Sequence, residues 1–224
     1  MDAIVRPASG EDTAALVPVV AEALTTGGLG VWLVPDAADR GEVLRRYARF
    51  VLERGLAHGR VDTTDDRCAV AVWYARLRPP PPSSVWCYDL HRLLGPYAPR
   101  AALLHAYVDA VPPDTPHHYL ALFATRPGRE AAASELLAGY HRVLDVDGLP
   151  AYAEVASDRP REGVFARLGY EPRSPILLKP GGPVLWRMVR RPAGERLGGL
   201  PRRVRLYRCA TPFRGRVIPA PRSP

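Results

Sequence analysis

Hydrophobic residues in the middle of the chain follow a pattern of strand, tight loop, helix and second strand. Residues 119–124 read Tyr-Leu-Ala-Leu-Phe-Ala, a nearly all-apolar run that is typical of a buried strand. Apolar side chains then recur at helical spacing from Arg129 to Asp147, after which Gly148 and Pro150 end the helix. A second short strand is predicted at Ala151–Ala156. The stretch is therefore predicted to form a β-α-β unit.

The loop between the first strand and the helix has features of an anion-binding site. Pro127 and Gly128 suit a turn that breaks the strand. A strand that leads into a helix start presents unpaired backbone N–H groups and the positive end of the helix dipole, which suits a pyrophosphate. Arg126 and Arg129 add positive charge at the same place. An ordinary β-α-β unit without a ligand shows the same pattern, so the pattern alone leaves both interpretations open.

Further helices are predicted on the N-terminal side of this unit. One is expected at Glu42–Leu56, and two more at Val85–Leu94 and Arg100–Val111, separated by Gly95-Pro96 and Pro99. The four prolines of residues 79–82 predict an extended polyproline II loop. A chain of 224 residues, 47% of them hydrophobic, is long enough to bury a sizeable core.

Several segments together resemble the GCN5-related N-acetyltransferase (GNAT) superfamily. In chain order they are Ile4–Ala8, Trp32–Asp36, Ala69–Trp73, His117–Leu122, Gly148–Ser157, Phe165–Tyr170 and Pro183–Arg191. The likeness covers roughly residues 1–191, and its N-terminal segments are similar to an actinobacterial branch that includes puromycin N-acetyltransferase. The resemblance implies an α/β (α+β) fold. It predicts a mixed, mostly antiparallel sheet of six or seven strands with helices on both faces, in which a central parallel pair splays to admit the cofactor.

The resemblance also implies an activity, the transfer of an acyl group from acetyl-CoA, or another acyl-CoA, directly to a small-molecule amine. The backbone of Phe123, Ala124 and Thr125 is then expected to bind the pantetheine arm. The residues expected to hold the pyrophosphate are Gly128, Arg129, Glu130, Ala131, Ala132, Ala133 and Ser134.

Acyl transfer to an amine requires one group that removes a proton from the ammonium and another that protonates the departing thiolate. By resemblance, Glu154 matches the position of the base, and a carboxylate among apolar neighbours has a raised proton affinity. A strand-end carboxylate paired with an arginine would have the same sequence signature. The tyrosine that usually acts as the acid is replaced by Phe165, and the candidates to replace it are Tyr152, Ser157 and Tyr119.

Two departures from the family pattern keep alternative functions open. Alanines 131–133 stand where the phosphate loop usually carries glycines, which let a backbone approach phosphate closely, and Phe165 cannot donate a proton. One alternative is a relative that has lost acetyl transfer and binds a ligand or partner. Another is a CoA-independent enzyme that acts on a small molecule. Either could serve secondary metabolism, and the resemblance itself points to antibiotic biosynthesis or resistance.

The acceptor pocket is expected among aromatic residues of the N-terminal half. Four aromatic residues are predicted to line it: Trp32, Trp73, Tyr74 and Tyr119. Any one of them could instead be an ordinary core residue, because aromatic side chains are large contributors to cores.

Charge divides the chain into a GNAT-like domain, residues 1–191, and a basic, proline-containing extension, residues 192–224. The extension carries +7 of the formal net charge of +8, and Val204-x-Leu206 could add an edge strand. Sparse aromatic residues in the extension do not favour nucleic-acid binding.

The three cysteines are far apart and no metal-binding motif is present. Without an apolar run or leader pattern, a cytoplasmic protein that does not enter membranes is expected. A homodimer is compatible with the sequence.

Overall fold

The computed structural model describes residues 3–78, 87–111, 113 and 115–196. Its strands are β1 (Val5–Pro7), β2 (Arg60–Thr64), β3 (Ala69–Arg76), β4 (His117–Thr125), β5 (Ala151–Ala156), β6 (Glu171–Leu177) and β7 (Val184–Arg190). Its helices are α1 (Thr13–Thr26), α2 (Gly28–Leu33), α3 (Ala37–His58), α4 (Cys87–Leu94), α5 (Ala98–Asp109), α6 (Glu130–Asp147) and α7 (Gly163–Arg167). The prolines at 79–82 and the segment Val204–Leu206 lie outside the described residues.

The strands form one seven-stranded sheet in the order β1-β2-β3-β4-β5-β7-β6. Every neighbouring pair is antiparallel except β4 and β5, which are parallel. Helix α6 connects these two strands and ends where Gly148 adopts a left-handed conformation, φ 68°. The predicted mixed, mostly antiparallel sheet is confirmed, and so is the predicted β-α-β unit.

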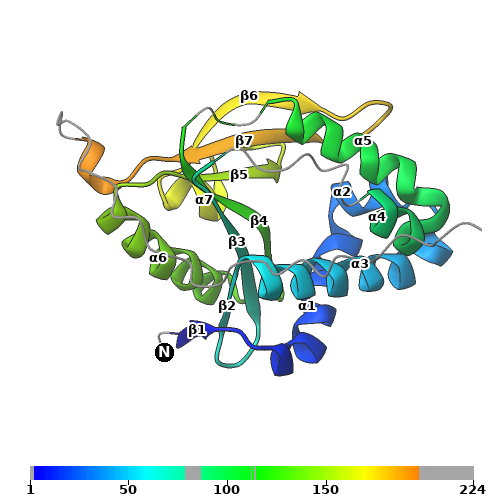
Figure 1. Ribbon diagram of the computed structural model, residues 1–224, viewed down its shortest axis with the longest axis horizontal. Coiled ribbons are helices and arrows are strands. Elements are labelled where there is room, and N and C mark those ends of the chain that lie inside the picture. Colours follow the sequence, from blue (N-terminus) through cyan, green and yellow to red (C-terminus); the bar gives the residue numbers. More distant parts are fainter. Residues whose placement is uncertain (1–2, 79–86, 112, 114, 197–224) are drawn as a thin grey trace, which may run out of the picture.

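Helices cover both faces of the sheet, as Figure 1 shows. On one face, α6 packs against β3, β4 and β5 through a cluster that includes Ala71, Trp73, Leu120, Leu136 and Ala153. On the other face, α1 and α3 cover β2, β3 and β4. A third cluster joins α2, α3, α4 and α5 to the ends of β6 and β7. In the central strands, side chains therefore alternate between the layer of α6 and the layer of α1 and α3.

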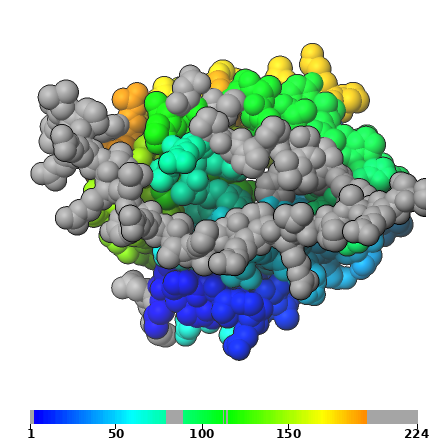
Figure 2. All heavy atoms as spheres, in the orientation of Figure 1, coloured from blue at the N-terminus to red at the C-terminus, as the bar shows by residue number. Residues whose placement is uncertain are grey.

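The segment between β3 and β4 forms the two expected helices, α4 and α5. In the space-filling view α5 (green) makes up the upper right of the surface, next to the N-terminal helices (Figure 2). Leu94, Ala101 and Leu104 are buried there against α2 and α3. Helix α3 is longer than predicted at both ends, and Asp36 caps it by accepting a hydrogen bond from the Ala38 N–H at 2.8 Å.

Two glycines of α3 provide a stability test with opposite signs. A methyl group at Gly55 would lie 2.6 Å from Val72 Cγ1, whereas nothing lies within 4 Å of one at Gly41. We expect Gly55→Ala to lower the free energy of unfolding by about 1–3 kcal/mol, because the helix must move off the sheet. Gly41→Ala should raise it by about 0.5–1 kcal/mol through helix propensity. Urea unfolding measures both, and a stabilising Gly55→Ala would contradict the close packing of α3.

Candidate active site

Glu154 lies on β5, directly opposite Arg187 of β7 in the antiparallel register. Alternation along β5 puts Ala151, Ala153 and Val155 against α6 and leaves Tyr152 and Glu154 on the opposite face. Burial raises the pKa of the Glu154 carboxyl, and this effect outweighs the opposing influence of Tyr152, Tyr119 and Arg187. The site thus contains a carboxyl group with increased proton affinity, as a general base for an ammonium requires.

Two tyrosine hydroxyls interact with this carboxyl. Tyr119 of β4 and Tyr152 of β5 are directly paired in the parallel register, and their ring centroids are 6.0 Å apart. Burial and the charge of Glu154 raise the pKa of both hydroxyls. Tyr152 is only 4% exposed, and its Oη makes no hydrogen bond of good geometry within the described part of the chain. A buried hydroxyl in this condition is suited to bind a polar group of a ligand.

The same face carries Tyr74 and Arg76 of β3. Tyr74 pairs with Tyr119 across the sheet, so Tyr74, Tyr119 and Tyr152 form a row over three adjacent strands. The Arg76 guanidinium carbon lies 5.5 Å from the ring centroid of Tyr74 and 5.6 Å from that of Tyr119. The site therefore has an aromatic floor with a cation above it and a carboxyl beside it.

Two of the four residues predicted to line the acceptor pocket do not join this group. Trp73 is 1% exposed and points toward α6, with its ring 4.8 Å from that of Tyr140, because neighbouring strand residues face opposite sides of the sheet. Trp32 is a core residue of α2, and its Nε1 donates a hydrogen bond to the Pro180 carbonyl at 3.1 Å. Tyr74 and Tyr119 do lie together, and Tyr119 interacts with Glu154.

The parallel strands β4 and β5 separate next to this row of tyrosines. Their pairing ends at Leu120 with Ala153, although β4 continues to Thr125 and β5 to Ala156. A register shift in the β3–β4 pairing places Ala121 in a bulge at the same level. From Ala121 to Thr125 the edge of β4 toward β5 is unpaired among the described residues. An open edge inside a sheet can bind an extended polar chain through backbone hydrogen bonds.

Two charged side chains at the start of α6, Arg129 and Glu130, already have partners in the protein. The Gly128 N–H, at φ 77°, donates to Glu130 Oε1 at 3.1 Å, so the Glu130 side chain folds back onto its own loop. Arg129 forms an ion pair with Asp66 of the β2–β3 turn. The Ala133 N–H donates to the Arg129 carbonyl at 3.0 Å, and Ser134 Oγ donates to the Glu130 carbonyl at 2.9 Å. The N–H groups of Ala131 and Ala132 remain without an acceptor among the described residues.

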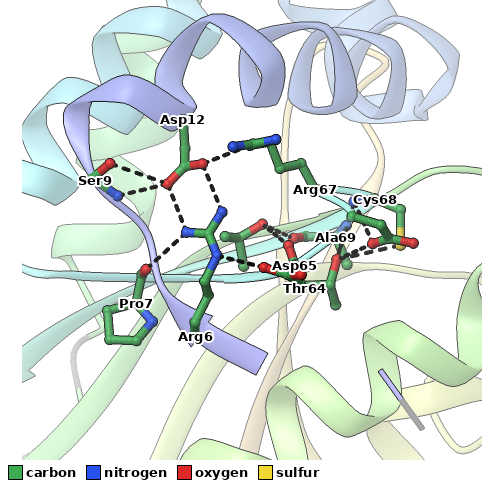
Figure 3. A network of polar contacts seen from close by, with 11 residues as sticks. Arg6, Pro7, Ser9, Asp12, Thr64, Asp65, Arg67, Cys68 and Ala69 are labelled. Atoms are coloured by element: carbon green, nitrogen blue, oxygen red, sulfur yellow. Dashed lines mark hydrogen bonds and ion pairs between the residues drawn. The ribbon is translucent and has the colours of Figure 1, made fainter. Parts of the chain in front are cut away.

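Asp66 belongs to a polar network that fixes the β2–β3 turn. It accepts hydrogen bonds from Thr64 Oγ1 at 2.7 Å and the Cys68 N–H at 3.2 Å. The Cys68 side chain, the Thr64 hydroxyl and the Cys68 N–H together lower the pKa of Asp66 to about 2. Nearby, Asp12 accepts from Arg6 through both carboxylate oxygens at 2.9 Å and from Arg67 at 2.7 Å (Figure 3). The turn that holds Arg129 is therefore itself tied to the start of α1.

Phe165 of α7 packs beside the open edge of β4. Its ring centroid lies 5.7 Å from that of Phe123 and 5.3 Å from that of Tyr170. Ser157, a predicted alternative acid, lies beyond the end of β5, where its Oγ accepts a hydrogen bond from the Arg159 N–H at 3.0 Å.

Among the described residues no group of three or more His, Cys, Asp and Glu side chains could hold a metal ion, and no helix is long and apolar enough to cross a membrane.

The sequence analysis did not identify Arg76, Arg187 or Asp66 as parts of this region. Arg76 could have been found from strand alternation, because it is two residues from Tyr74 and shares its face. Arg187 depends on the β5–β7 register and Asp66 on a contact between residues 63 positions apart. No local sequence signal contains either of these facts.

Several known proteins have a structure similar to that of this chain. No protein-family model and no curated protein matches the sequence. Solved structures do match over most of their length. A Corynebacterium glutamicum structure described as histone acetyltransferase HPA2 and related acetyltransferase is 24% identical with a TM-score of 0.63, covering 86% of this chain and 98% of that one.

Two insect acetyltransferases match more remotely in sequence. Arylalkylamine N-acetyltransferase 2 from Aedes aegypti is 10% identical with a TM-score of 0.59, and 85% of this chain and 99% of that one are covered. A Drosophila melanogaster polyamine N-acetyltransferase that forms N-acetylagmatine is 15% identical with a TM-score of 0.53, at 85% and 100% coverage. With its sheet order and its parallel central pair, this chain has the fold of the GCN5-related N-acetyltransferases.

Proposed function

We propose that this protein transfers an acyl group, in the first instance acetyl, from acyl-CoA to the amine of a small molecule. The observation that carries the proposal is the position of Glu154, whose raised pKa suits a base, beside the point where β4 and β5 separate. The similar solved structures include enzymes described as acting on arylalkylamines and polyamines, which supports an amine as acceptor. The compartment and an actinobacterial origin remain expectations from the sequence.

The residues of this chain fit acyl-CoA as a co-substrate that supplies a thioester. The open edge of Phe123–Thr125 would bind the pantetheine arm through backbone groups, and the unpaired N–H groups of Ala131 and Ala132 would bind a phosphate. Glu154 would take a proton from the acceptor ammonium, either directly or through a water molecule. The free amine would then attack the acyl carbon while the C–S bond breaks, with no acyl group bound to the protein.

The buried hydroxyl of Tyr152 interacts with the Glu154 carboxyl, next to the proposed position of the reacting groups. Its raised pKa means that the hydroxyl keeps its proton at neutral pH, so it can donate a hydrogen bond but is a weak acid for a thiolate. We therefore assign Tyr152 and Tyr119 to positioning. Among the described residues we assign no general acid, since Phe165 lacks a hydroxyl.

The charges of the loop before α6 give a test of CoA binding. Glu130 occupies the Gly128 N–H and places a carboxylate near the proposed phosphate, so Glu130→Gln should tighten acetyl-CoA binding about three- to tenfold. Arg126 is exposed and has no ion-pair partner within the described ranges, so Arg126→Gln should weaken binding by a similar factor. Isothermal titration with acetyl-CoA and CoA measures both effects.

The matched control is Glu135→Gln, which removes an exposed carboxylate further along the same helix. It should change the affinity by less than Glu130→Gln does, because exposed charges are screened over about 10 Å. An absence of binding up to millimolar CoA would reject the proposed function. Binding that is unaffected by Glu130 and Arg126 would move the phosphate site away from this loop.

A second candidate function is ligand binding without transfer on the same scaffold. It is favoured by Phe165, which cannot donate a proton, and by the Glu130 side chain on the loop. A panel of primary amines with detection of thiol release separates the two functions. CoA binding without release for any acceptor would support the second.

A further inference from the structure

The face that carries Glu154 also carries a cation with no carboxylate partner. Arg76 is partly buried, and its guanidinium lies over the rings of Tyr74 and Tyr119. Its side chain makes no ion pair or hydrogen bond within the described part of the chain. Contacts of this kind hold the guanidinium in place and leave the N–H donors at its edge available to a ligand.

Arg76 and Glu154 lie at opposite ends of the row of tyrosines. Arg76 pairs with His117 at the beginning of β4, whereas Glu154 is two residues beyond the Tyr119–Tyr152 pair in the direction of β5. Both side chains project from the face opposite α6. A molecule lying over Tyr119 would therefore meet a carboxyl at one end and a guanidinium at the other.

The other arginines of this face have partners. Arg187 donates to the Ser174 carbonyl at 2.9 Å, to the Val111 carbonyl at 3.2 Å and to Ser174 Oγ. Arg54 interacts with Tyr74 and Asp89. Arg187 is thus committed to holding β6 and β7 against the segment after α5, and Arg54 to bridging neighbouring elements.

We infer that the acceptor is an amine that also carries an anionic group, separated from the amine by several bonds, with the amine at Glu154 and the anion at Arg76. The inference rests on the proposed function and narrows its substrate class. A guanidinium on aromatic rings recognises carboxylate or phosphate through charge-assisted, bidentate hydrogen bonds. The same cation repels a second ammonium, so a diamine fits the site poorly.

The test uses acceptors of equal length and different charge: 6-aminohexanoate, its neutral amide and 1,6-diaminohexane. Binding by isothermal titration and kcat/KM for acetyl transfer are measured separately on the full chain. We expect the acid to be preferred over the amide by about tenfold, and the diamine to be the poorest. The shorter 4-aminobutanoate and the longer 8-aminooctanoate, each with its amide, show which separation between amine and anion the site prefers.

Arg76→Gln should bring the ratio of kcat/KM for the acid to kcat/KM for the amide close to one. Arg78→Gln should leave this ratio unchanged. Arg78 is exposed and lies two residues further along, so it controls for the loss of one positive charge. A preference for the acid in binding without thiol release would support recognition of the anion by Arg76 and reject acyl transfer. Turnover that favours the amide or diamine would overturn the inference and keep acyl transfer, and no binding by any compound would also overturn the inference.

Discussion

Glu154→Gln is expected to lower kcat/KM for acyl transfer by about 10²–10⁴-fold while the protein stays folded. The factor is what a positioned general base contributes, and glutamine keeps the size of the side chain but cannot accept the proton. Acetyl-CoA affinity should be unchanged, because the pantetheine and phosphate contacts proposed here use backbone groups of β4 and α6. The measurements are steady-state kinetics and CoA titration on both proteins.

The pH dependence follows from the direction of the Glu154 shift. Burial raises the pKa of this carboxyl, so the basic form is lost as pH falls through a value above the usual range for glutamic acid. The kcat/KM of the wild type should then fall about tenfold per pH unit below that value. The residual rate of Glu154→Gln should lack this limb.

Stability should respond in the opposite direction to activity. A carboxyl whose pKa is raised by folding binds its proton more tightly in the folded state, so its effect on stability becomes less favourable as pH rises through the folded pKa. Glu154→Gln avoids this loss, and its melting temperature at neutral pH should equal or exceed that of the wild type. Glu162→Gln, on the exposed loop after β5, controls for charge and should change neither activity nor its pH profile. A Glu154→Gln variant with wild-type kcat/KM would show that Glu154 is not the general base.

The β-α-β unit could be predicted because its signals are local. An apolar run, a helical repeat and a stop at Gly148 each extend over a few residues, and the structure places β5 at Ala151–Ala156 as expected. The left-handed conformation of Gly148 is the reason glycine marks the helix end. The ends of α3 were less well predicted because the Asp36 cap was not recognised.

The composition of the pocket could be predicted only in part. Tyr74 and Trp73 are adjacent in sequence, and both were expected in the pocket, but a strand sends neighbouring side chains to opposite faces. The structure buries Trp73 under α6 and leaves Tyr74 beside Tyr119. The alternation rule would have excluded one of the two and included Arg76, but choosing the face requires knowing where α6 packs.

The electrostatics of the phosphate loop could be predicted only in part from its own residues. Arg129 was expected to face a phosphate, yet its guanidinium is paired with Asp66 of a turn far away in sequence. Glu130 is among the residues expected to hold the pyrophosphate, yet in the structure its side chain accepts a hydrogen bond from the Gly128 N–H. The pairing of Arg129 depends on the β2–β3 turn lying against the start of α6, a tertiary contact without a local signal.

Phe165→Tyr is expected to increase kcat by up to about 10²-fold, the lower end of what a positioned acid contributes. The ring lies 5.7 Å from that of Phe123, on the part of β4 whose edge is open, so an added hydroxyl would project from a side chain beside the proposed thioester site. None of the described side chains is assigned as the general acid, because burial and the charge of Glu154 raise the pKa of Tyr152. The measurement is a single-turnover rate with saturating acetyl-CoA and acceptor.

The dependence on the leaving group distinguishes an added acid from a change in packing. A thiolate of low proton affinity needs less help to depart, so the gain from Phe165→Tyr should shrink when acetyl-CoA is replaced by an acetyl ester of an aromatic thiol. Phe123→Tyr adds the same hydroxyl to the neighbouring ring and serves as the matched control, with no gain expected. An unchanged rate for Phe165→Tyr, at wild-type melting temperature and CoA affinity, would show that protonation of the thiolate does not limit the proposed transfer. Solvent would then be the proton source, and the loss of tyrosine at this position would carry no kinetic cost.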